Sequence, residues 1–319
     1  MTAFVEENDS VTYAFGTPVP WHETNCVEIP VGTPLMDIAR MSKQDWPVEK
    51  RKLFREKNNG FIAIADQMCI VRTDIDHVLG FATDGYQLYQ NEDGFRAVQP
   101  FIDSGVARVD TTGTLKNGKI VWVLLRINTE DLVINGKDVL RRYILVSWGH
   151  DGKTGIRVGY VDVRVVCWNT ITAAHNSSMS KLIRMTHKGD VVSNVDAVIQ
   201  TMDVTVQEFR TTADNYKRML DKRINAHDLR EYVRVTLGLV EKDDNKKATN
   251  LIDRVVDTAY TGYGIGEAAN TVWGAFNGMT QYLSHNATRN PDNRLSSLWF
   301  GQNSSMLKDA YTNAMKMVA

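Results

Sequence analysis

Apolar and polar residues alternate along much of the first half of the chain, a pattern that is typical of β-strands. The clearest case joins the runs Ala107–Leu115 and Ile120–Asn128 through the turn Lys116–Lys119. This turn contains Asn117-Gly118, and both residue types tolerate the positive φ angles that a tight hairpin turn requires. The sequence therefore predicts an antiparallel hairpin here.

Other segments of the first half carry similar signals. Pro34 follows a suitable N-cap, Thr33, and starts a predicted helix that ends near Met41. A charged stretch then runs from Glu49 to Asn59 with no clear period. The remaining predictions are strand-like runs at Phe61–Ala65, Cys69–Thr73, His77–Phe81 and Leu132–Ile134, turns at Asp84-Gly85 and Glu92–Gly94, and a helix at Gln99–Ser104.

From about Ser193 the apolar residues recur every three or four positions, which indicates amphipathic helices. The predicted helices are Val195–Tyr216, Asp228–Leu237, Thr249–Tyr260, Ala268–His285 and Leu307–Met317. We expect an α+β protein with a mainly antiparallel N-terminal sheet, hairpins and short helices, followed by a helical C-terminal region. The predicted domains are residues 1–190 and 191–319.

A second predicted hairpin, within residues 141–168, carries the most distinctive chemistry. Its second strand, Ile156–Cys167, places Tyr160 and Arg164 on one face and Arg157 on the other. Asn169 or Thr170 then caps a predicted helix that continues toward Met185. Cationic and aromatic residues interleave along this region, as in surfaces that bind phosphates and stack bases. The candidate nucleic-acid-binding residues are Arg141, Arg142, Trp148, Lys153, Arg157, Tyr160, Arg164, Trp168, Lys181 and Arg184.

The overall composition is that of an ordinary globular protein, with 43% hydrophobic residues, 24% charged residues and a net charge of −1. The charge is unevenly distributed, because residues 1–50 hold eight acids and three bases, whereas residues 137–190 hold nine bases and four acids. The basic segment suits a polyanion. It equally suits an inter-subunit surface that meets the acidic N-terminal segment.

The sequence contains no recognisable catalytic or metal-binding motif. The three cysteines lack a CxxC pattern, and the histidines form no HxH or HExxH motif. The loop Gly262–Gly266 lacks the lysine of a phosphate-binding loop. We expect no cofactor and no metal. The N-terminus is acidic and no long apolar segment occurs, so the sequence predicts a soluble cytoplasmic protein that does not bind membranes.

Several segments resemble the phage- and plasmid-like proteins grouped as domain of unknown function 932. The segments are Thr83–Tyr89, Gly113–Lys119, His150–Gly152, Val163–Thr170, Thr271–Tyr282 and Trp299–Gly301. The resemblance covers the chain from about residue 20 onward and implies a role in the DNA metabolism of mobile elements, in the host cytoplasm. It implies no catalytic residues. The order of elements is also similar to that of ring-forming single-strand annealing proteins, a likeness of architecture alone.

Together these features predict a non-catalytic protein that binds single-stranded DNA, assembles into a homo-oligomer such as a ring, and promotes annealing in recombination or replication. One alternative is a metal-dependent enzyme acting on nucleic acid through Asp74, Asp84, Asp151 and Asp162. Another is a phage protein that binds a host protein with the same basic face.

Overall fold

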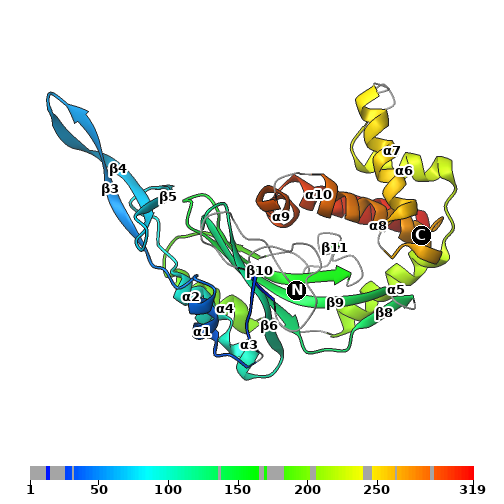
Figure 1. Cartoon of the computed structure of the whole chain (residues 1–319), viewed down its shortest axis with the longest axis horizontal. Helices are drawn as coiled ribbons and strands as arrows, with labels where there is room; N and C mark the ends of the chain where they lie inside the picture. Colours follow the sequence, from blue (N-terminus) through cyan, green and yellow to red (C-terminus); the bar gives the residue numbers. More distant parts are fainter. Residues whose placement is uncertain are drawn as a thin grey trace. The chain divides into compact units, whose positions relative to one another are not determined.

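The computed structural model confirms the α+β class (Figure 1). It describes residues 12–14, 26–30, 32–135, 138–164, 169–170, 183–201, 206–239, 246–262, 264–287 and 291–319. Strands dominate the first part of the chain and helices the second, as the change from a two-residue to a 3.6-residue period predicts.

The strands of the described residues form two sheets. They are β1 (Thr12–Ala14), β2 (Cys26–Glu28), β3 (Val48–Lys57), β4 (Gly60–Arg72), β5 (His77–Ala82), β6 (Ala107–Leu115), β7 (Ile120–Ile127), β8 (Leu132–Asn135), β9 (Asp138–Gly149), β10 (Ile156–Arg164), β11 (Asn169–Thr170) and β12 (Ile183–Met185). One sheet has the order β3-β4-β5. The other has the order β11-β10-β9-β7-β6-β1-β2, and in addition β12 pairs with β10 and β8 with β9.

Most helices follow the last strand in the sequence. The α-helices of the described residues are α1 (Leu35–Met41), α2 (Asn91–Ala97), α3 (Gln99–Asp103), α4 (Val191–Thr201), α5 (Val206–Asp221), α6 (Ala226–Thr236), α7 (Lys246–Thr261), α8 (Val272–Gln281), α9 (Pro291–Phe300) and α10 (Gln302–Val318). A short 3₁₀ turn, Gly266–Ala268, precedes α8, and a π-helical turn, Tyr282–Asn286, follows it.

The chain forms two compact units that interleave along the sequence. The first unit comprises Met1–Asn128, Ile144–Gly159 and Leu182–Asp203, and the second comprises Thr129–Tyr143, Tyr160–Lys181 and Val204–Ala319. Strands β9 and β10 therefore have residues in both units. The division at residue 190 stays a prediction about independently folding domains.

The hairpin with the Asn-Gly turn is confirmed as β6 and β7. Lys116, Asn117 and Gly118 all have positive φ angles, between 55° and 82°. By contrast, the charged stretch after Glu49 is strand β3, which the sequence pattern missed because polar residues occupy both of its faces. The two short runs predicted after it belong to one strand, β4.

The turn predicted at Glu92–Gly94 is instead part of helix α2. The side chains of Gln90 and Asp93 form a capping box that satisfies the free backbone groups at the start of this helix. Gly94 has no Cβ, and a Cβ there would overlap the ring of Trp148. This glycine therefore permits close packing of the helix instead of making a turn.

The helix predicted from Asn169 to Met185 is wrong at both ends. Asn169 and Thr170 form strand β11, which pairs with β10. Ile183–Met185 form strand β12, which also pairs with β10. The middle of the predicted helix lies outside the described residues. The long helix predicted over Val195–Tyr216 is found as α4 and α5.

The second unit has an aromatic core. Tyr216 on α5 stacks near Trp273 and Phe276 of α8, with ring centroids 4.7 and 5.9 Å away. Thr271 is the N-cap of helix α8, and its hydroxyl accepts a hydrogen bond from the Gly274 amide. All of its residues are buried, so this part of the chain serves the core.

Candidate functional site

A basic pocket in the first unit is the best candidate for a binding site. Its volume is about 660 Å³, within the range of small-ligand sites. Three cationic side chains line it, those of Lys153, Arg184 and Lys188, and all three residues are exposed. Among its described lining residues there is no carboxylate. The pocket therefore suits an anionic ligand.

The loop between β9 and β10 forms one wall of the pocket. The carboxylate of Asp151 accepts hydrogen bonds from the amides of Lys153 and Thr154, at 2.9 and 2.6 Å, and from the Thr154 hydroxyl. The Asp151 carboxylate therefore stabilises the conformation of the loop itself. Gly152 has a φ of 74°, and a Cβ there would overlap the carbonyl oxygen of Phe81. The loop thus packs directly against the backbone of β5.

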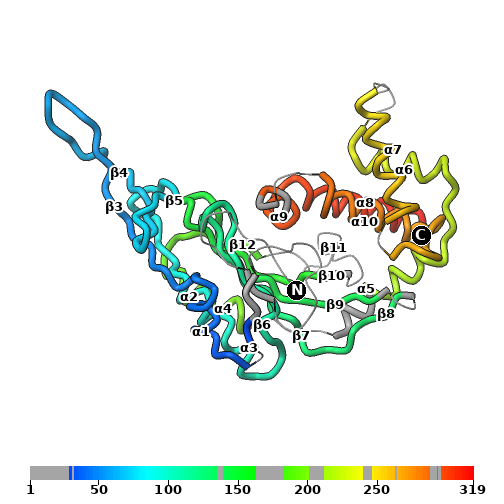
Figure 2. Tube along the Cα trace, viewed as in Figure 1, coloured from blue at the N-terminus to red at the C-terminus, as the bar shows by residue number. Residues whose placement is uncertain are grey.

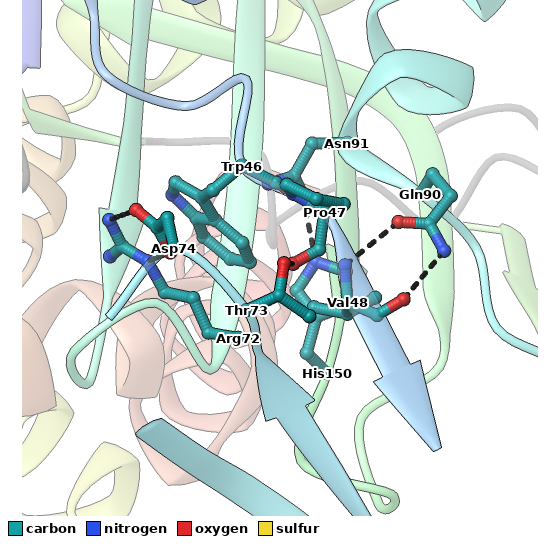
Figure 3. Close-up of polar contacts among 9 residues, drawn as sticks. All are labelled: Trp46, Pro47, Val48, Arg72, Thr73, Asp74, Gln90, Asn91 and His150. Carbon is teal, nitrogen blue, oxygen red and sulfur yellow. Dashed lines mark hydrogen bonds and ion pairs between the residues drawn. The ribbon is translucent and has the colours of Figure 1, made fainter. Parts of the chain in front are cut away.

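A buried polar network holds this loop in place, and Figure 3 shows three of its residues, Trp46, Asn91 and His150. The Asn91 amide donates to the carbonyl of Trp46, while its oxygen accepts from the Trp148 indole and from His150 Nε2, both at 2.8 Å. The His150 amide donates to the carbonyl of Lys119 at 2.7 Å. Residues from four separate segments therefore fix the start of the loop.

His150 is neutral in this network. Burial is the main cause that lowers its pKa to about 3, and repulsion from His187 adds to it. Since the Asn91 oxygen can only accept, Nε2 of His150 carries the proton and donates it. The imidazole is therefore a structural hydrogen-bond donor, and it adds no positive charge to the pocket.

Trp46 joins this network to the base of the β3–β4 hairpin (Figure 3). The Arg72 guanidinium lies 4.5 Å from the centroid of the Trp46 ring and makes two 2.8 Å hydrogen bonds to Asp74. These bonds to Arg72 lower the pKa of Asp74. Gln90 exchanges hydrogen bonds with the backbone of Val48 at 3.0 and 2.9 Å. The hairpin thus starts from a rigid base.

Two arginines lie opposite each other beside the pocket. Arg157 of β10 and Arg184 of β12 are partners in the antiparallel register. Like charges in directly opposed positions destabilise a sheet by about 0.2–1 kcal/mol. Burial lowers the pKa of Arg157, and the charge of Arg184 lowers it further, while the charge of Asp151 acts in the opposite direction. An anion bound near this pair would relieve the repulsion.

Aromatic rings complete the lining. Tyr86 stacks on His187, with centroids 4.4 Å apart and planes 15° apart. The Tyr86 hydroxyl donates to the carbonyl of Gly149 at 3.1 Å, and burial raises its pKa. Phe81 also lines the pocket and is 58% exposed. Of these three, Phe81 offers the most open apolar surface to a ligand.

Four of the predicted residues have other environments. Arg142 is buried and makes two hydrogen bonds to the carboxylate of Asp162, at 2.8 and 3.0 Å. Its guanidinium also lies 5.5 Å from the centroid of the buried Tyr160 ring. Arg141 is half-buried and bonds to Asp131 at 2.9 Å. Trp148 is buried against Asn91 and α2, so neither it nor Tyr160 presents a ring for stacking on a base.

The structure brings three of the ten predicted residues close together, since Lys153 and Arg184 line the pocket and Arg157 lies beside it. Arg164 belongs to β10, but its side chain, together with Trp168 and Lys181, lies outside what the structure describes. Nucleic-acid binding by any of the ten stays a prediction. Lys188, Tyr86 and Phe81 also line the pocket, but no sequence signal points to them because they lie on separate segments of the chain.

The acidic residues of the alternative enzymatic hypothesis have separate partners and do not form a common site. Asp74 pairs with Arg72, Asp162 with Arg142, and Asp151 shapes its own loop. Within the described ranges, no group of three or more His, Cys, Asp or Glu side chains is placed to hold a metal ion.

The chain belongs to the family described as Domain of unknown function (DUF932), whose model matches residues 78–299. No curated protein and no solved structure matches the chain. The matched region includes most of the pocket, from Phe81 to Lys188. In the described part of the chain, no helix has both the length and the apolar character needed to cross a bilayer.

Proposed function

We propose that this protein binds single-stranded nucleic acid at the basic pocket, without catalysing a reaction on it. The observation that carries the proposal is the lining itself, because Lys153, Arg184 and Lys188 converge with no carboxylate among the described lining residues. Cations of this kind hold phosphates, and the exposed ring of Phe81 supplies a surface for a base.

The rigidity of the pocket supports the same proposal. Asp151 and the network around His150 hold the loop in place before any ligand arrives. A site formed in advance loses less conformational entropy on binding. The opposed pair of Arg157 and Arg184 favours a polyanion, since bound phosphates would offset the repulsion between the two guanidinium groups.

The wider role that we propose is strand annealing in the recombination or replication of mobile-element DNA, carried out by an assembly of several copies. Its support is the resemblance to phage and plasmid proteins and the distribution of charge. Each further copy would add one pocket along the bound strand.

Fluorescence anisotropy of a labelled oligonucleotide over a salt series tests the binding. A single strand should bind better than a duplex. The logarithm of the affinity should fall with the logarithm of the salt concentration, by about 0.7 for each phosphate contacted. Replacing Lys153 or Lys188 with alanine should weaken binding and reduce this slope by about 0.7 each.

Lys308→Ala is the matched control, because Lys308 is an exposed lysine on α10 of the second unit. It should leave both affinity and slope unchanged. Mass photometry of the same samples reports the assembly. Absence of binding by the wild-type protein at low salt would refute the proposal and direct attention to a host-protein partner.

A further inference from the structure

Strands β3 and β4 extend beyond β5 as a two-stranded ribbon (Figures 1 and 2). We call its outer part, residues 54–63, the arm. Phe54 is 57% exposed, Phe61 78% and Ile62 43%. Several large apolar side chains that are exposed on one element often mark an interaction site, whereas a single exposed one is ordinary.

The register of the arm separates its side chains into two faces. Phe54 pairs with Ala63 and Glu56 with Phe61, so the two phenylalanines lie on the same face as diagonal neighbours. Arg55 pairs with Ile62 and Lys57 with Gly60. The second face therefore carries two cations and no carboxylate. One face suits bases, and the other suits phosphates.

The arm is continuous with the basic pocket. Gln67 of β4 and Phe81 of β5 line the pocket. Lys50 of β3 donates hydrogen bonds to the carbonyls of Asp84 and Tyr86, at 2.6 and 3.0 Å, and so fixes the base of the ribbon to the pocket wall. The strand from Gln67 to Phe61 spans at most about 20 Å. One nucleic-acid strand can reach both places.

We propose that the arm is a second contact for the single-stranded nucleic acid that the pocket binds, with Phe54 and Phe61 stacking on bases and Arg55 and Lys57 holding phosphates. This inference rests on the proposed function. It also supplies the stacking rings that the buried Trp148 and Tyr160 do not. A single strand is the occupant, because its bases are free to lie against the rings.

The test compares the double variant Phe54→Ser/Phe61→Ser with the wild-type protein on labelled oligothymidylates of about four and about sixteen nucleotides. The short oligonucleotide fills only the pocket and should bind equally well to both proteins. The dissociation constant of the long one should rise at least about tenfold, because each base–aromatic stack contributes about 1–3 kcal/mol. The salt slope should not change, since no cation is removed.

A second variant, Arg55→Gln/Lys57→Gln, should instead reduce the salt slope for the long oligonucleotide by about 1.4 and leave the short one unaffected. The control is Val133→Ser/Val235→Ser, which removes two side chains that are 52% and 50% exposed in the second unit. It should bind like the wild-type protein. Circular dichroism melting of each variant checks that folding is unchanged.

The outcomes separate this inference from the proposed function. If neither oligonucleotide binds to the wild-type protein, both ideas fail. If the long oligonucleotide binds and the phenylalanine variant stays within twofold of wild type, the arm makes no contact and only the inference fails. It fails equally if that variant keeps its affinity but loses self-association or binding to anionic lipid vesicles, because the arm then serves another partner.

Discussion

Arg142 and Arg157 belong to the same pattern of interleaved cationic and aromatic residues, but they have opposite environments in this protein. Arg142, in the second unit, is buried with both guanidinium hydrogen bonds directed to Asp162. Arg157, in the first unit, lies opposite another arginine, Arg184. The same alternation of cations and aromatics thus yields a buried ion pair in one place and a pair of opposed arginines beside the basic pocket in the other.

The difference lies in the residue that the sheet places across from each arginine. Asp162 is on β10, and with Arg142 it forms a neutral, buried pair. Arg184 is on β12 and adds a second positive charge beside Arg157 instead. The environment of each arginine therefore depends on the strand beside it, and variants that exchange these situations test the comparison.

The largest effect should come from the buried pair. Arg142→Leu leaves the Asp162 carboxylate without its partner inside the protein, and we expect the free energy of unfolding to fall by about 3–5 kcal/mol. Urea denaturation followed by circular dichroism measures it. The double variant Arg142→Leu/Asp162→Leu should recover most of the loss. A single variant as stable as wild type would show that the pair is dispensable.

An intermediate effect concerns pH and His150. Its pKa of about 3 in the folded protein lies below the 6.5 of an unfolded chain, so the unfolded state binds the proton first as the pH falls. Stability should therefore drop below pH 6.5, by up to about 1.4 kcal/mol per pH unit, until the pH reaches about 3. Above pH 6.5 this contribution is constant.

The pH effect is measured by thermal melts of the wild-type protein and His150→Gln between pH 7 and pH 4. Glutamine keeps a donor for Asn91 but does not titrate, so the variant should lack this part of the slope. Equal slopes in the two proteins would mean that His150 is not held neutral in the folded state.

The smallest effect on stability is also the most informative, because it has opposite signs in two measurements. Arg184→Ala removes the charge facing Arg157, so the free energy of unfolding should rise slightly, by about 0.2–1 kcal/mol. Affinity for a single-stranded oligonucleotide should fall, as Arg184 lines the pocket. If the variant lost both stability and affinity, Arg184 would be a structural residue like Arg142.

The sequence predicted the elements whose signals are local. The turn Asn117-Gly118 between two alternating runs was sufficient to predict the β6–β7 hairpin, and helical periodicity identified α6, α7 and α10. Glycine was ambiguous, since Gly94 looked like a turn residue but lies in a helix, where Trp148 packs against it. Packing of this kind depends on residues far away in the chain.

The candidate site was predictable only in part for the same reason. Lys153, Arg157 and Arg184 were identified by charge, but nothing in the spacing shows that Phe81 and Lys188 meet them at one pocket. Whether a cation is buried or open depends on its neighbour across the sheet. The aromatic residues were misleading because strand alternation does not distinguish a sheet covered on both faces from one that is open.

Strand β3 escaped prediction because lysine, arginine and glutamate crowd both of its faces, and this composition has a consequence for the protein in the cell. Among the strands that the structure describes, β3 lies at the edge of its sheet, and one row of its backbone groups has no neighbouring strand there. An edge of that kind invites other chains to add on and start an aggregate. The many charged side chains of β3 discourage such growth. The residues that prevented prediction of the strand therefore also protect it from aggregation.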